Sequence, residues 1–121
     1  MWPRMEDASP IALFPARVGR RPMPVCFDRQ ELKEILDVYG RMVAAGQWRD
    51  YAIDGTAEAA VFSVFRRASE MPLYRIVKWP RLARRQGAYA VVGMDGRILK
   101  RGHTLAAALR MFDRKLIRLV E

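Results

Sequence analysis

The sequence predicts a single α+β domain, with an antiparallel meander of about five strands and an N-terminal and a C-terminal helix packed on one face. Two amphipathic segments of helical periodicity, residues 28–46 and 104–120, enclose five short apolar runs. The turns between these runs are short, and short connections favour antiparallel neighbours. The 121 residues suit one domain, which at this length buries a core without a disulfide or a metal.

Residues 1–24 differ from the rest of the chain. They hold five of the seven prolines and show no periodicity. We interpret them as a flexible Pro-rich tail and residues 25–121 as the domain. The tail has no apolar core of a secretory signal, and no apolar run reaches the ~20 residues that span a bilayer. We therefore expect no contact with a membrane.

The first helix has marked ends. Asp28 is a plausible N-cap, and Glu31 stands three residues later, as in a capping box. Phe27 and Leu32 have the spacing of a hydrophobic staple, and Gly46 suits the position after the helix. The predicted core stripe consists of Leu32, Ile35, Leu36, Tyr39, Met42 and Val43.

Five strand-like runs follow, at residues 49–54, 59–67, 72–79, 87–94 and 97–101. Asp95-Gly96 between the last two predicts a two-residue type I′ hairpin. The strands do not alternate cleanly, because Val61 and Phe65 share one face while Phe62 and Val64 share the other. Either the tail, a twin subunit or a partner covers the second sheet face, or its apolar residues are scattered over the surface.

The last helix is predicted over residues 104–120, with Thr104 as a candidate cap. Its apolar positions recur at helical spacing, which predicts a face packed on the sheet. That stripe consists of Leu105, Ala108, Leu109, Phe112, Leu116 and Leu119.

The charge is strongly polarised. The formal net charge is +9, which favours an anionic partner such as nucleic acid or an acidic protein. Residues 64–103 carry ten Lys and Arg against two acidic residues, and the densest stretch is "KWPRLARRQG" at residues 78–87. This stretch is either an anion-binding surface or a solvated loop. The candidate anion-binding residues are Lys78, Trp79, Arg81, Arg84, Arg85, Lys100, Arg101 and His103.

Two details of the basic residues stay open in the sequence. Trp79 either stacks on a base or packs against the domain. The residues before the last helix either help to hold a phosphate or merely precede an uncapped helix start. In a meander, successive strand ends alternate between opposite edges, so Arg66 and Arg67 are expected at the other edge from the 78–87 stretch.

No catalytic constellation is visible, and we predict a protein that is not an enzyme and holds no metal or cofactor. Cys26 is the only cysteine, which excludes an internal disulfide and a zinc finger and fits a reducing cytoplasm. His103 is the only histidine, and one histidine does not make a triad.

Long strings of the sequence resemble a bacterial family of small cytoplasmic proteins known only as a domain of unknown function. These strings are "FDRQELKEILDVYGRMVAAGQWRDYAID", "AVFSVFRRASEMPLYRIVK", and "RQGAYAVV" followed by "LKRGHTLAAALR". The resemblance covers about residues 26–115 and implies no activity, cofactor or site residue. A second likeness, to the double-stranded-RNA-binding domain, concerns only the order of the elements.

Two classes of function remain. The first is a non-catalytic module that associates with nucleic acid through a basic surface. The second is a protein-interaction module or a homodimer that uses the second sheet face, with the charge serving solubility.

Overall fold

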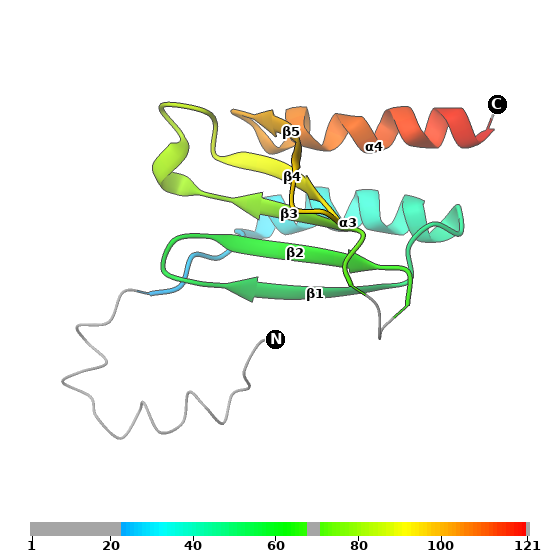
Figure 1. Cartoon of the computed structure of the whole chain (residues 1–121), viewed down its shortest axis with the longest axis horizontal. Coiled ribbons are helices and arrows are strands. Elements are labelled where there is room, and N and C mark those ends of the chain that lie inside the picture. Colours follow the sequence, from blue (N-terminus) through cyan, green and yellow to red (C-terminus); the bar gives the residue numbers. More distant parts are fainter. Residues whose placement is uncertain (1–22, 68–70, 121) are drawn as a thin grey trace, which may run out of the picture.

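The computed structural model describes residues 23–67 and 71–120 and shows one layer of helices on one sheet (Figure 1). Helices α3 (Arg29–Ala44) and α4 (Leu105–Val120) both pack on the same sheet face. The opposite face, called the open face below, carries neither helix. The predicted α+β class is confirmed. The predicted tail lies almost entirely outside the described residues and stays a prediction.

The sheet is a five-stranded antiparallel meander in the order β1-β2-β3-β4-β5. Because successive strands run in opposite directions, the β3–β4 loop and the start of α4 lie at one end of the strands, called the loop rim. The β2–β3 connection and the β4–β5 turn lie at the opposite end of the strands, called the far rim. The strands are β1 (Asp50–Gly55), β2 (Ala60–Phe65), β3 (Tyr74–Lys78), β4 (Tyr89–Gly93) and β5 (Ile98–Gly102).

The β4–β5 hairpin differs from the predicted two-residue turn. The Gly93 amide donates to the Arg97 carbonyl, which leaves three residues in the loop. The Gly96 amide donates to the Gly93 carbonyl, and Gly96 has φ +87°. A type I turn followed by a left-handed glycine is a common three-residue hairpin. The sequence signal located the turn correctly and misjudged its length.

Helix α3 begins as predicted. The Glu31 amide donates to the Asp28 side chain at 2.7 Å, and the Asp28 amide donates to the Glu31 carboxylate at 2.8 Å. These two bonds form the capping box. Gly46 follows the helix with φ +77°, a conformation that favours glycine.

The buried face of α3 differs from the predicted stripe. Leu36 and Val43 are 39% and 40% exposed, whereas Val38 and Glu31 are buried. The buried line of residues 31, 35, 38 and 42 is rotated by about 70° from the predicted one, at 100° per residue. The physical cause is that Glu31 turns inward to polar partners on the sheet. The predicted stripe leaves Glu31 out because a hydrophobicity pattern does not assign an acid to the interior.

The core lies between the two helices and one sheet face, and its six largest fully buried side chains come from both layers. These side chains are Phe62, Phe112, Ile35, Ile76, Val64 and Val91.

The α4 cap is also in place, since the Ala107 amide donates to the Thr104 hydroxyl at 3.1 Å. Leu119, predicted as core, is exposed instead. Within the described part of the chain, neither helix is long and apolar enough to cross a membrane.

Candidate anion-binding surface at the loop rim

Lys78 is engaged inside the fold. Its ammonium group donates to the Glu31 carboxylate at 2.7 Å and to the Cys26 carbonyl at 3.0 Å, on the helix-covered face. The Tyr89 hydroxyl donates to the other oxygen of the same carboxylate. The sequence shows no acid near Lys78, but α3 supplies one from a distant part of the chain. Lys78 is therefore neutralised by the fold and lies apart from the exposed arginines.

The Glu31 carboxylate stays ionised because of these contacts. Burial by itself would raise the pKa of Glu31, but hydrogen bonds from Lys78, Tyr89 and the Asp28 amide hold that pKa below its ordinary value. Burial and the hydrogen bond to Glu31 raise the pKa of Tyr89, so this hydroxyl remains a donor. The group ties α3 to β3 and β4.

Trp79 packs on the open face. It lies against the buried side chains of Val77 and Val92, and the Arg101 guanidinium stands 5.7 Å from its ring centre. Such an arrangement is a cation–π contact. The ring face that a base would need is thus taken by Arg101, which favours the packing interpretation of Trp79. The Nη1 atom of Arg101 is buried and has no hydrogen-bond partner among the described residues.

The loop between β3 and β4 is held against the junction of β5 and α4. It contains a short 3₁₀ helix, Pro80–Leu82. The His103 Nδ1 atom lies 3.3 Å from the Ala83 carbonyl oxygen and donates to it, since a carbonyl only accepts. Gly87 has φ +97°, and a Cβ there would stand 2.5 Å from the Gly102 carbonyl oxygen. This close approach brings two segments that are distant in sequence to one place.

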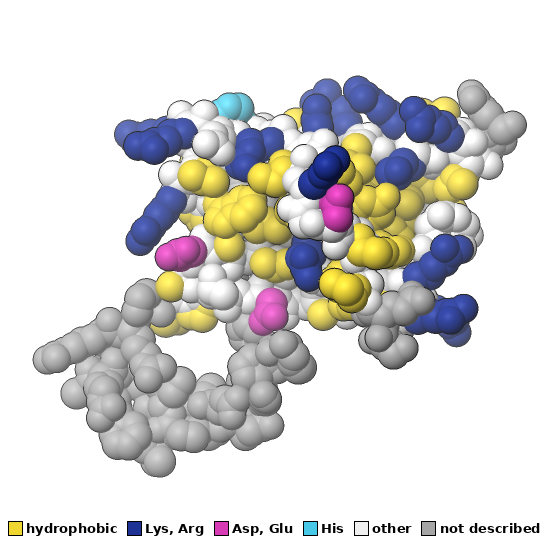
Figure 2. Space-filling view, viewed as in Figure 1, with side chains coloured by type: hydrophobic (Ala, Val, Ile, Leu, Met, Phe, Trp, Pro, Cys, Tyr) yellow, Lys and Arg dark blue, Asp and Glu magenta, His cyan; other side chains and the backbone are white. Residues whose placement is uncertain are grey.

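The docked loop gathers five of the candidate residues at the loop rim. Figure 2 shows the histidine, in cyan, with Lys and Arg side chains beside it at the upper left. None of the ion pairs within residues 23–67 and 71–120 involves these five side chains. Arg81, Arg84, Arg85 and His103 are exposed, and Arg101 is partly buried. The name basic rim is used below for Arg81, Arg84, Arg85, Arg101 and His103.

Two predicted contributors lie elsewhere or are already used. Lys100 pairs in register with Val91 of the helix-covered face, so it points away from Arg101, its neighbour in the strand. At the start of α4, the Thr104 cap uses one of the amides that a phosphate would need. The anion-binding capacity of the loop rim therefore resides in side chains.

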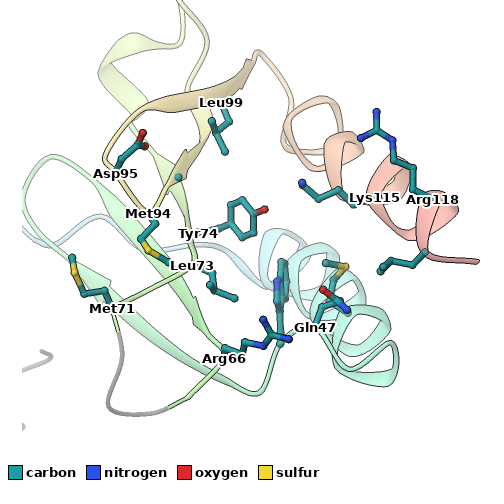
Figure 3. Close-up of a pocket in the computed structure, with 14 residues that line it drawn as sticks. Gln47, Arg66, Met71, Leu73, Tyr74, Met94, Asp95, Leu99, Lys115 and Arg118 are labelled. Carbon is teal, nitrogen blue, oxygen red and sulfur yellow. The ribbon is translucent and has the colours of Figure 1, made fainter.

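The far rim carries a second basic group, which confirms that the basic residues divide between the two ends of the strands. Arg66 follows β2 there, and Lys115 and Arg118 lie on the last turns of α4 (Figure 3). Sequence reasoning did not include the two α4 residues. Their spacing of three on a helix, next to the exposed Leu119, is the signal that could have identified them.

Gly87→Ala tests whether the loop docks as described. The added Cβ would both strain the backbone and collide with Gly102, so we expect a loss of about 1–3 kcal/mol in the free energy of unfolding. Gly96→Ala is the matched control, since Gly96 also has a positive φ but open space around its Cα. Urea denaturation of both variants measures the difference. Equal losses would mean that the loop does not press on Gly102.

Comparison with known proteins identifies one family. The model of a family described as protein of unknown function (DUF2794) matches residues 25–109, more than half of the chain. No curated protein and no solved structure matches the chain. Among the described residues, no three His, Cys, Asp or Glu side chains are grouped to hold a metal ion.

Proposed function

This chain belongs to the DUF2794 family, and we propose that it is a non-catalytic cytoplasmic module that associates with nucleic acid through the basic rim. The supporting observation is that loop docking brings five basic side chains from two distant segments to the loop rim. The described residues give them no acidic partner. Four of the five are arginines, whose like charges repel one another, and phosphates relieve that repulsion.

The chemistry of the basic rim favours phosphates over base edges. Guanidinium groups bind phosphate oxygens in a bidentate manner, and three of the five residues are arginines on one exposed loop. Loop side chains give poor geometry for reading bases, and Trp79 is covered by Arg101. Binding should therefore be weak, insensitive to sequence and strongly weakened by salt.

The salt dependence of duplex binding tests this proposal. For Arg81→Ser/Arg84→Ser/Arg85→Ser, we expect the slope of log K against log salt to flatten by about two to three units, if each arginine neutralises one phosphate. The control is Arg66→Ser/Arg67→Ser/Arg118→Ser, which removes the same charge from the far rim. Fluorescence anisotropy of a labelled random-sequence duplex gives both slopes.

The control separates a local contact from a general effect of net charge. If both triple variants flatten the slope equally, the basic rim has no special role. If the wild-type chain does not retain duplex or single strand even at low salt, the nucleic-acid proposal fails and the 78–87 stretch is a solvated loop.

A homodimer formed through the open face is the second candidate. Figure 2 shows hydrophobic side chains gathered over the middle of this face. Val61 and Trp79, both partly exposed, surround the buried Ala59, Val77 and Val92. Light scattering over a range of concentrations distinguishes the two functions. A dimer that persists on dilution, without nucleic-acid binding, would favour this candidate.

A further inference from the structure

A cleft of about 940 Å³ lies at the far rim, on the opposite side of the molecule from the basic rim. It is bounded by the last turns of α4, by the β4–β5 turn and by the start of β3, with Tyr74 at its centre (Figure 3). No residue of the basic rim lines it.

Apolar side chains that the fold leaves exposed converge on this cleft. Met71, Met94, Leu99 and Leu119 are between 48% and 63% exposed, although they come from three separate parts of the chain. Scattered exposed apolar residues need no explanation, whereas a cluster of them at a concave surface indicates a binding site. Methionine adapts its shape readily and is common at surfaces that bind apolar helix faces.

The mouth of the cleft is positively charged. Arg66, Lys115 and Arg118 stand around it, and among residues 23–67 and 71–120 Asp95 is the only acidic residue in its lining. Asp95 is already engaged, since it accepts from the Arg97 amide at 3.0 Å and lies 3.6 Å from the Arg97 Nε atom. Lys115 lies 5.8 Å from the Tyr74 ring centre. The lining thus offers three cations to a ligand.

We infer that this cleft binds an amphipathic helix of a partner protein, with its apolar face on Met71, Met94, Leu99 and Leu119 and its flanking carboxylates against Arg66, Lys115 and Arg118. A helix fits better than a small molecule, because small-molecule sites enclose most of the ligand, whereas the four apolar side chains at this cleft are about half exposed. Helices bind such grooves through apolar residues spaced three and four apart. The charge of the cleft selects an acidic helix.

Methionine methyl resonances report binding at this cleft directly. Of the seven methionines, Met42, Met71 and Met94 line it, whereas Met23 and Met111 do not. The full chain, labelled with ¹³C at the methionine methyls, is titrated with a synthetic helix of about five turns that has Leu on one face and Glu on both flanks. We expect the Met71 and Met94 methyl signals to shift, while those of Met23 and Met111 do not. A peptide of scrambled sequence is the first control.

Charge-changed variants make the test specific. Lys115→Glu/Arg118→Glu should weaken binding of the acidic helix by about tenfold or more, because charged hydrogen bonds are lost. It should also gain binding of the same helix with Lys in place of Glu. Arg110→Glu/Arg114→Glu, exposed on α4 but outside the cleft lining, is the matched control and should leave both affinities unchanged.

Three results would overturn the inference. The first is an absence of Met71 and Met94 shifts up to the solubility limit of the acidic helix. The second is equal binding of the scrambled peptide, which would mean nonspecific apolar contact. The third is that anionic lipid vesicles, or dilution of the chain alone, move these methyl signals when the acidic helix does not, which would make the occupant a membrane or a second copy.

Discussion

Ile35→Ala should lower the free energy of unfolding by about 2–5 kcal/mol, because it leaves a cavity among fully buried side chains. Leu36→Ala, one position along α3, should cost only about 1 kcal/mol, since Leu36 is 39% exposed and loses little buried area. The two variants remove similar side chains from neighbouring positions of one helix. Urea denaturation with a common slope compares them directly.

The ranking of these two variants tests the face that α3 presents to the sheet. The apolar pattern alone places both residues in the core, whereas the structure buries only the first. Equal losses for Ile35→Ala and Leu36→Ala would show that α3 is rotated toward the apolar stripe and that Glu31 does not face the sheet.

Glu31→Gln should be the second large effect, with a loss of about 2–4 kcal/mol. Removing one partner of a largely buried ion pair leaves the other charge uncompensated. Here the stranded charge is Lys78, and the side chains of the pair are only 10% and 17% exposed. Glutamine preserves the shape and the capping-box hydrogen bond, but it replaces the oxygen that accepts from Tyr89 with an NH2 group, so the variant removes the charge together with that hydrogen bond.

The Glu31 contribution should depend on pH. Because the folded-state pKa of Glu31 lies below its ordinary value, its stabilisation is complete above the ordinary pKa of a glutamate. It is lost as the pH falls through the lower folded-state pKa. The difference in stability between the wild-type chain and Glu31→Gln should therefore shrink on acidification. A difference that grows at low pH would contradict the direction of the shift.

A double-mutant cycle separates the ion pair from packing. Glu31→Gln/Lys78→Met should cost less than the two single variants together, because no charge is stranded in the double variant. Tyr89→Phe removes only the hydroxyl and should cost about 0.5–1.5 kcal/mol. Additive losses in the cycle would mean that Glu31 and Lys78 do not interact.

Local signals in the sequence were sufficient for most of the fold. The capping box at Asp28 and Glu31, the glycine at position 46 and the cap at Thr104 bound the helices correctly. Short apolar runs with turn residues between them predict the meander, because hairpins need only neighbouring segments. Such features depend on residues a few positions apart, which a single sequence displays.

Features that depend on distant partners could not be predicted. Glu31 is buried because Lys78 and Tyr89 meet it, and these residues lie 47 and 58 positions along the chain. The same pair removes Lys78 from the exposed charges. Arg101 covers Trp79, although the β3–β4 loop, β4 and the β4–β5 turn separate them along the chain. Only the strand register brings such groups together.

The candidate site could be predicted only in part, because some of its residues are neighbours in the sequence and others meet only in the fold. The exposed arginines at positions 81, 84 and 85 follow from the composition of one loop. Their association with Arg101 and His103 requires the close approach of Gly87 to Gly102, which no local pattern encodes. The cleft at the far rim joins segments from both halves of the domain and was missed altogether.

Mapping of the contact surface by amide chemical shifts, with a short DNA duplex added to the ¹⁵N-labelled full chain, shows whether nucleic acid binds at the basic rim. We expect shifts concentrated at residues 81–87 and 101–104, together with the Nε signals of Arg81, Arg84 and Arg85, and their disappearance at high salt. Shifts concentrated instead around Arg66, Lys115 and Arg118, or on the open face away from the loop rim, would contradict this expectation.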